Sequence, residues 1–243
     1  MIKALLTIDD IASRNTPAIV DYLAEKGIPA IMFAWGENVE KYFDNAVYAL
    51  KSGIVVGNHS YSHPQFSELS FEECVNEIEK CEAVLDRLYQ EAGVERRYRP
   101  FRFPYGNKGG ENKEALQKYL RKNGFDKVDD TRIPFKSWKE MGLDQDIDTF
   151  WTFDFMEWNI REGSGFTQDD VMARIHYIDP ETNEGLLVDG TEHLLLLHAH
   201  DETEELVPEY YKLFLEEILA NGVEFIEPKF IKKGDGSLSL RKR

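Results

Sequence analysis

Short apolar runs alternate with amphipathic stretches along most of the chain, and this alternation limits the possible fold more than any other feature. Such a pattern is typical of βαβ units, in which crossover helices join parallel strands. We therefore expect an α/β fold in one domain, either a Rossmann-like sheet or a barrel, because periodicity does not separate the two. The expected strands are residues 3–7, 30–34, 54–57, 150–152, 194–197 and 223–226.

Capping residues mark the ends of the expected helices. Thr16 and Pro17 are typical of a first helical turn, and Gly27 is typical of the end of that helix. Ser70 followed by Glu73 predicts a capping box at the start of a long amphipathic helix. Further helices are expected at residues 112–122, 168–177 and 208–220. Residues 231–243 have no apolar period, so we expect a domain over 1–230 followed by a mobile tail.

Charge and hydropathy exclude several classes of function. The 243 residues include 29 basic and 45 acidic ones, a net charge of −16, which repels nucleic acid and other polyanions. A neutral or cationic substrate is easier to accept. No apolar run approaches the roughly 20 residues of a membrane-spanning helix. The first strand leads straight into two aspartates without room for a secretory signal, so a complete chain is expected in the cytoplasm.

Polar residues that directly follow the expected strands are candidates for the functional site, because α/β folds place their chemistry at the carboxyl ends of parallel strands. His59 and His63 are four positions apart, so both side chains can reach one cation from one face of a helical turn. Such a pair also occurs at surfaces and in cores without a metal. The full set that the rule selects is Asp9, Asp10, Asn58, His59, Asp154 and His198.

Two adjacent carboxylates end the first expected strand. Carboxylates that leave water need a cation or a proton, so one of Asp9 and Asp10 is a candidate ligand and the other a candidate base. An N-cap or a loop salt bridge is the alternative explanation. Two histidines and one carboxylate leave open positions on zinc or a similar ion, as in catalytic sites. Such an ion makes bound water acidic enough to be a nucleophile near neutral pH.

Several short motifs, in order, resemble those of the polysaccharide deacetylases, also called the NodB-homology domain or carbohydrate esterase family four. Residues 7–10 (Thr-Ile-Asp-Asp) resemble the first motif, usually Thr-Phe-Asp-Asp, and residues 59–63 resemble the second, His-Ser/Thr-x-x-His. Residues 102–106 (Arg-Phe-Pro-Tyr-Gly) are similar to the third motif and 196–198 (Leu-Leu-His) to the fifth. The resemblance covers roughly residues 1–230.

The resemblance implies a distorted (β/α) barrel of about seven strands with a metal site at its mouth. Asp10, His59 and His63 would hold one divalent transition metal, with Zn²⁺ expected first and Co²⁺ or Ni²⁺ as alternatives. Asp9 would act as the base toward the attacking water, and the backbone N–H of Tyr105 would stabilise the oxyanion.

The resemblance also implies roles on the other side of the site. His198 would protonate the leaving nitrogen, and Arg102 would pair with Asp9. Either Glu157 or Asp154 would orient Arg102. Two further side chains, Trp158 and Leu196, would line the pocket for the acyl methyl group.

The sequence departs from the family pattern in three places. Glu157 precedes Trp158 where the fourth motif normally has Asp, and Ile11 stands where Gly usually follows the two aspartates. His198 and His200 both follow the last strand of the site, and alternation points them to the same side. The Leu-x-His spacing favours His198 as the acid.

These features predict metal-dependent hydrolysis of an amide, the N-deacetylation of an N-acetylated sugar or polysaccharide. A small cytosolic amide, imide or formamide is an alternative substrate on the same fold. A metal-free relative that only binds a glycan is the alternative outside the enzymes. No nucleic-acid partner is expected, and the sequence does not indicate the oligomeric state.

Overall fold

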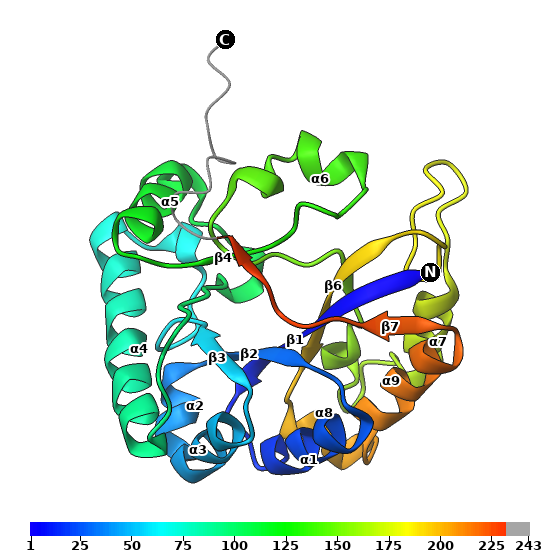
Figure 1. Cartoon of the computed structure of the whole chain (residues 1–243), viewed down its shortest axis with the longest axis horizontal. Helices are drawn as coiled ribbons and strands as arrows, with labels where there is room; N and C mark the ends of the chain where they lie inside the picture. The colour runs from blue at the N-terminus through cyan, green and yellow to red at the C-terminus, as the bar shows by residue number, and fades with distance from the viewer. Residues whose placement is uncertain (232–243) are drawn as a thin grey trace.

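The apolar runs form a parallel sheet at the centre of the molecule (Figure 1). In the computed structural model, which describes residues 1–231, the strand order is β3-β2-β1-β6-β5, and β7 also pairs with β1. Strands β4 and β8 form a separate antiparallel pair. The strands are β1 Ile2–Ile11, β2 Ala30–Ala34, β3 Val55–Asn58, β4 Lys127–Val128, β5 Phe153–Asp154, β6 Glu192–His198, β7 Val223–Phe225 and β8 Phe230–Ile231.

Irregular chain joins the two edges of the sheet and closes it into a distorted barrel. At the end of β3, the Asn58 carbonyl accepts a hydrogen bond from the Arg102 N–H at 3.0 Å. The neighbouring carbonyl of Phe101 accepts one from the N–H of Thr149, at 2.7 Å, shortly before β5 begins. The segment around residue 101 therefore occupies the place of a missing strand. The expectation of a single-domain, distorted (β/α) barrel is confirmed.

Helices alternate with the strands and pack around the barrel (Figure 1). They are α1 Thr16–Lys26, α2 Gly36–Lys41, α3 Phe43–Lys51, α4 Phe71–Ala92, α5 Lys113–Lys122, α6 Lys136–Glu140, α7 Gln168–His176, α8 Asp201–Leu206 and α9 Tyr210–Ala220. Short 3₁₀ turns lie at η1 Phe66–Glu68, η2 Pro104–Gly106, η3 Gly110–Asn112, η4 Leu143–Gln145 and η5 Glu157–Asn159. Ser70 caps α4 with the expected capping box, and α1 ends at Gly27, whose φ is 63°.

The differences from the expected elements concern segments of at most nine residues. The expected strand at 150–152 lies two or three residues later, as β5. Strands β4 and β8 have two residues each, which is too short to show a period of two. Helices α2, α3, α6 and α8 were not expected either. Ile231, placed in the tail by the sequence, is the last residue of β8. The rest of the expected tail, 232–243, lies outside the described residues.

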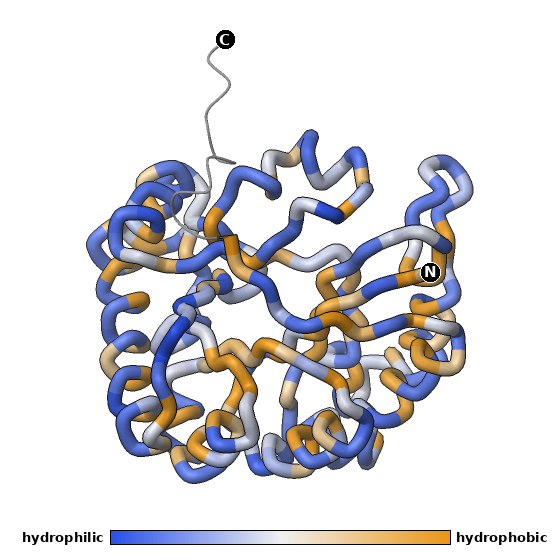
Figure 2. Tube along the Cα trace, in the orientation of Figure 1, coloured by the Kyte–Doolittle hydropathy of each residue, from blue (hydrophilic) through white to orange (hydrophobic). Residues whose placement is uncertain are grey.

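Side chains on β1 alternate between two environments. Leu6 and Ile8 belong to the large core between the strands and the helices, whereas Leu5 belongs to a cluster inside the barrel. By alternation, Thr7 and Asp9 take the next interior positions. The barrel interior therefore changes from apolar to polar toward the carboxyl end of β1. Figure 2 shows the same concentration of apolar residues on the strands and on the inward sides of the helices.

The barrel closure can be tested at Gly57, in β3. A Cβ atom at this position would lie 2.7 Å from the Pro100 carbonyl oxygen and 3.0 Å from the Phe33 ring. Because a backbone oxygen cannot rotate away, Gly57→Ala is expected to lower the free energy of unfolding by about 1–3 kcal/mol. Lys51→Ala, at an exposed position just before the strand, is the control and should change it by less than about 0.5 kcal/mol. Urea denaturation measures both, and equal stability of the two variants would contradict the closure.

Candidate active site

A pocket with a volume of about 420 Å³ opens at the carboxyl end of the barrel strands. Its walls come from the ends of β1, β2, β3, β5 and β6 and from the chain next to these ends, as expected for a parallel α/β fold. The lining residues are Asp9, Asp10, Trp35, His59, His63, Tyr105, Trp151, Asp154, Trp158, Arg161, Leu196, His198 and His200.

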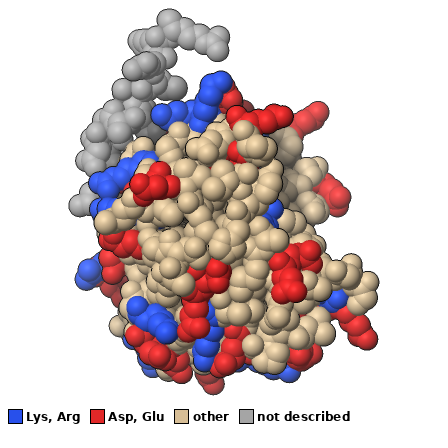
Figure 3. All heavy atoms as spheres, turned by 90° about the vertical axis from the view of Figure 1, so that its right-hand side faces the viewer, with Lys and Arg blue, Asp and Glu red and all other residues tan. Residues whose placement is uncertain are grey.

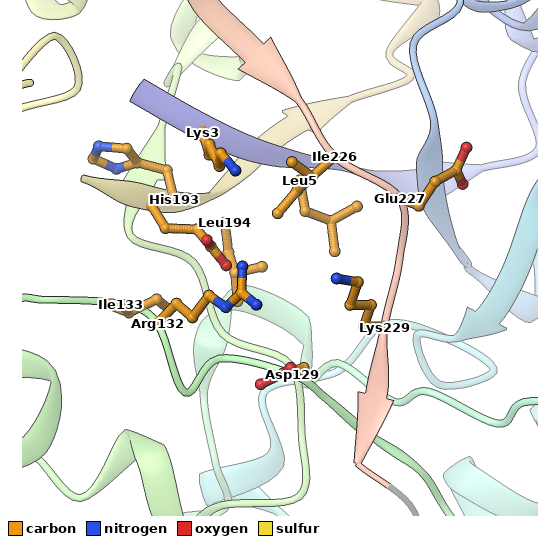
Figure 4. Close-up of a pocket in the computed structure, with 11 residues that line it drawn as sticks. Lys3, Leu5, Asp129, Arg132, Ile133, His193, Leu194, Ile226, Glu227 and Lys229 are labelled. Carbon is orange, nitrogen blue, oxygen red and sulfur yellow. The ribbon is translucent and has the colours of Figure 1, made fainter. Parts of the chain in front are cut away.

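A smaller pocket, of about 80 Å³, lies at the amino-terminal end of β1 and β6 (Figure 4). Basic and acidic side chains line it in equal number, and the ring of His193 is held outside it by hydrogen bonds with the hydroxyls of Thr152 and Thr191. Within the described residues, both clusters of side chains with metal-ligand spacing lie at the opposite, carboxyl end. The larger pocket is therefore the candidate active site.

Asp10, His59 and His63 converge on one point in the larger pocket. The Asp10 Oδ1 atom lies 3.3 Å from His63 Nε2 and 3.6 Å from His59 Nε2, and the two Nε2 atoms are 3.2 Å apart. Ligands around a tetrahedral zinc ion lie about 3.3 Å from one another. Asp10 Oδ1 is buried and has no hydrogen-bond partner within residues 1–231. The spacing and the unpaired oxygen therefore fit one divalent transition metal.

The backbone at the mouth of the barrel is strained. Asp10, His63 and Tyr105 have φ values of 65°, 58° and 58°, in the left-handed region that residues other than glycine rarely adopt. Each such residue costs about 1–3 kcal/mol, which the surrounding structure must offset. At Asp10 this conformation interrupts the alternation of β1. Asp9 and Asp10 can therefore both face the pocket, although neighbouring strand residues normally point to opposite sides.

Arg102 connects the metal cluster to Asp9. Its guanidinium is fully buried and donates hydrogen bonds at 2.8 Å to Asp9 Oδ1 and to the Thr7 hydroxyl. Its backbone carbonyl lies 2.8 Å from His59 Nδ1. A carbonyl can only accept a hydrogen bond, so the proton of this ring is on Nδ1 and the lone pair of Nε2 faces the cluster.

The sequence-based expectation that Glu157 or Asp154 orients Arg102 is wrong. The carbonyl oxygens of Thr149 and Phe150 accept the remaining hydrogen bonds of the guanidinium, at 3.0 and 3.3 Å. These carbonyls are available because the segment before β5 closes the barrel at this point. Asp154 instead accepts hydrogen bonds from the Met156 N–H and from the ring N–H of Trp158.

Glu157 binds His198. Its Oε1 atom accepts a hydrogen bond from the His198 backbone N–H at 2.6 Å and lies 3.0 Å from Nδ1 of the ring. Burial lowers the pKa of His198, but the Glu157 charge and its hydrogen bond outweigh burial and raise this pKa to about 9. The imidazole is therefore protonated near neutral pH, and its Nε2–H is free to donate. This is the state that a general acid requires.

Three titratable neighbours show how burial acts across the site. Burial alone would raise the pKa of Asp10, but a hydrogen bond from His200 and the charges of nearby histidines lower it well below its ordinary value. Burial lowers the pKa of His63 to about 4, so this ring is neutral, as a metal ligand must be. Burial also raises the pKa of Asp154.

The remaining expected residues lie in the same pocket. Trp158 and Leu196 both line it. Tyr105 is 61% exposed, and its backbone N–H donates no hydrogen bond to another backbone group in the described part of the chain. His200 also lies at the mouth, where its Nε2 contacts Asp10 rather than Glu157.

Sequence reasoning missed three lining residues. Trp35 stacks on the ring of His63, with 4.8 Å between ring centres, and Trp151 packs over Arg102. Trp35 directly follows β2, so the rule about strand ends could have found it. Arg161 comes from the irregular chain after η5 and has no sequence signal of its own.

Comparisons with known proteins point to one family. The model of the family described as polysaccharide deacetylase matches residues 2–128. The chain is 38% identical over 105 residues to a peptidoglycan-N-acetylglucosamine deacetylase of Bacillus cereus, covering 43% of this chain and 36% of that protein. It is 32% identical over 115 residues to a peptidoglycan-N-acetylmuramic acid deacetylase of Bacillus subtilis, covering 46% and 23%. The alignments thus span about a third or less of these relatives.

The fold has solved counterparts. One is a peptidoglycan N-acetylglucosamine deacetylase in complex with 4-naphthalen-1-yl-N-oxidanyl-benzamide, with a TM-score of 0.64 and 22% identity. The match covers 93% of this chain and 85% of that chain. The similarity of fold therefore extends over most of the chain.

The metal cluster can be tested by elemental analysis. Wild-type protein incubated with Zn²⁺ and then desalted is expected to keep one ion per chain, because three converging ligands are present. His59→Ala and His63→Ala each remove one ligand and should lose most of this metal. His176→Ala, which removes a half-exposed histidine on α7, is the control and should keep it. Undiminished metal in both site variants would refute the cluster as a metal site.

The pairing of Glu157 with His198 can be tested by NMR titration of the metal-free protein. The imidazole of His198 is expected to titrate at about 9 in the wild type. In Glu157→Gln the countercharge is lost and burial remains, so the pKa should fall to or below the ordinary value of about 6.5. Glu162→Gln, at an exposed position in the same loop, should leave the titration unchanged.

The same pairing predicts a dependence of stability on pH. The folded pKa of His198 lies above the unfolded value of about 6.5, so the stabilisation is complete below about pH 6.5. It is lost as the pH rises through about 9. The free energy of unfolding of the wild type and of Glu157→Gln is measured between about pH 6.5 and pH 9. A difference between the two proteins that does not change with pH would contradict the pairing.

Proposed function

The chain belongs to the polysaccharide deacetylase family, and on that premise we propose that it is a metal-dependent hydrolase that removes the acetyl group from an N-acetylated sugar or polysaccharide. The observation that carries the proposal is the arrangement of one pocket. The Asp10–His59–His63 cluster lies beside the Asp9–Arg102 pair, and His198 with a raised pKa lines the same pocket.

The three clustered residues would hold one divalent metal ion. We assign Zn²⁺ first and Co²⁺ or Ni²⁺ as alternatives, because two imidazoles and one carboxylate suit these ions and leave positions open. When bound, such an ion supplies a Lewis acid that polarises the acyl group and makes water more acidic.

Asp9 is suited to be the base. Its Oδ1 atom is paired with Arg102, and its Oδ2 atom lies 3.4 Å from His59 Nε2 at the edge of the cluster. Oδ2 can therefore take the proton of a water molecule that attacks the acyl carbon. The N–H of Tyr105, which has no backbone partner in the described chain, can donate to the oxyanion that forms.

His198 completes the reaction. An amine leaves poorly as an anion, so the nitrogen must receive a proton as the C–N bond breaks. The Nε2–H of His198 can supply this proton, and Glu157 holds the ring protonated and in place. The products are the free amine and a carboxylic acid. Trp158 and Leu196 line the pocket and can enclose the acyl methyl group.

An uncharged glycan suits the electrostatics of this molecule. The net charge is −16, and Figure 3 shows one face on which acidic and basic side chains are spread among uncharged residues. A polyanion would be repelled from such a surface. Two similar proteins are named as deacetylases of peptidoglycan amino sugars, which supports an N-acetylated glycan over a small amide or imide.

Two other expectations concern location and metal-free binding. No helix in the described part of the chain has both the length and the apolar character needed to cross a bilayer, and a cytoplasmic location stays a prediction. A metal-free glycan-binding role fits the site poorly, because it leaves the buried Oδ1 of Asp10 without any partner.

The role of Asp9 provides the test of the proposed reaction. Acetate release from N-acetylglucosamine oligomers and from peptidoglycan is measured with metal-loaded protein, beside formamides and cyclic imides. Asp9→Asn is nearly isosteric but cannot accept a proton, so turnover should fall about 10²–10⁴-fold while the metal content stays unchanged.

Asp169→Asn, at an exposed position on α7, is the matched control and should keep full activity. No acetate from any glycan, with turnover of a formamide or imide instead, would overturn the substrate class. Recovery of Asp9→Asn by excess metal would show that Asp9 is a ligand rather than the base.

A further inference from the structure

His200 lies against the carboxylate of Asp10 from the side opposite the cluster. Its Nε2 atom is 2.6 Å from Asp10 Oδ2, whereas Oδ1 faces His59 and His63. The two oxygens of one carboxylate therefore have different surroundings. Oδ2 has a hydrogen-bond donor, and the buried Oδ1 has none.

Arg161 determines which nitrogen of His200 carries the proton. The Nη2 atom of Arg161 lies 3.1 Å from His200 Nδ1, and a guanidinium can only donate hydrogen bonds. Nδ1 is therefore the acceptor, and the proton lies on Nε2, which donates it to Asp10. Glu202 holds Arg161 in turn, with 3.0 Å between Oε2 and Nη1. Donor and acceptor are thus defined at each contact: Arg161 donates to Glu202 and to His200, and His200 donates to Asp10.

We propose that His200 is a positioning residue for the metal site, which restrains Asp10 to bind the metal through Oδ1 alone. The proposal rests on the metal site of the proposed function. A carboxylate held by one oxygen fills one coordination position, so positions stay open for water and for the acyl oxygen. Hydrogen-bonded partners of this kind fix the orientation of metal ligands in general.

The contacts of His200 argue against two other roles. Both ring nitrogens are engaged, one by Arg161 and one by Asp10, so the ring has no free proton for a leaving nitrogen. It is not a direct ligand either, because its Nε2–H points at Oδ2 rather than joining the cluster around Oδ1. His198, paired with Glu157, has the free Nε2–H that the acid needs.

Co²⁺ binding to the purified chain, without substrate, tests this role. His200→Ala should weaken Co²⁺ affinity about 10–100-fold, measured by competition with a chelator. His200→Gln keeps an N–H that can reach Asp10 and should recover most of this loss. Arg161→Met should weaken binding in the same direction and by less. His176→Ala, the exposed-histidine control on α7, should bind as the wild type does.

The visible absorption of bound Co²⁺ gives an independent signature. Release of Asp10 in His200→Ala allows both carboxylate oxygens to bind, which raises the coordination number and weakens the absorption. His200→Gln should keep the wild-type spectrum. A fold defect alone would change the amount of bound metal without this selective change in the spectrum.

Several outcomes would overturn the inference. They are wild-type affinity in His200→Ala, affinity in His200→Gln as low as in His200→Ala, and a wild-type protein that takes up no Co²⁺. The second would make His200 a direct ligand, and the third would remove the metal site itself. Metal binding with the expected order of variants, but no acetate release from any glycan, would overturn only the proposed substrate.

Discussion

The barrel depends on a guanidinium that is buried without access to water. A buried charge costs several kcal/mol unless it is both paired and hydrogen-bonded. Arg102 meets this condition through the carboxylate of Asp9, the hydroxyl of Thr7 and the carbonyl oxygens of Thr149 and Phe150. The first two partners belong to β1 and the last two to the segment that closes the barrel. Closure of the barrel and pairing of the charge therefore require each other.

Arg102 also positions side chains of the candidate active site. The N–H of Arg102 bonds to Asn58 at the end of β3, and its carbonyl orients the ring of His59. Its side chain holds Asp9, which is next in sequence to the proposed ligand Asp10. A change in the packing of Arg102 would therefore displace the proposed base and a proposed metal ligand together. This coupling explains how a site assembled from distant segments keeps one geometry.

The site departs from the pattern of its family at the acidic residue that precedes Trp158. Glu157 stands where Asp is usual, and its longer side chain meets both the backbone and the ring of His198. Because carbonyl oxygens already orient Arg102, Glu157 is free to keep this imidazole protonated. His200, the second histidine after β6, donates a hydrogen bond to Oδ2 of Asp10. Two acidic groups at the mouth, Glu157 and Asp10, thus each pair with a different histidine.

The sequence by itself determined the parallel α/β architecture and the residue types at the mouth, because the period of a strand and the position of its end are local properties. It therefore placed Asp9, Asp10 and His59 at one end of the barrel. Only the tertiary structure decided the partners of the polar groups at this end, such as Glu157 for His198 and Arg161 for His200. These pairs join residues 41 and 39 positions apart. Their contacts depend on left-handed turns and on side-chain directions, which leave no periodic pattern in the sequence.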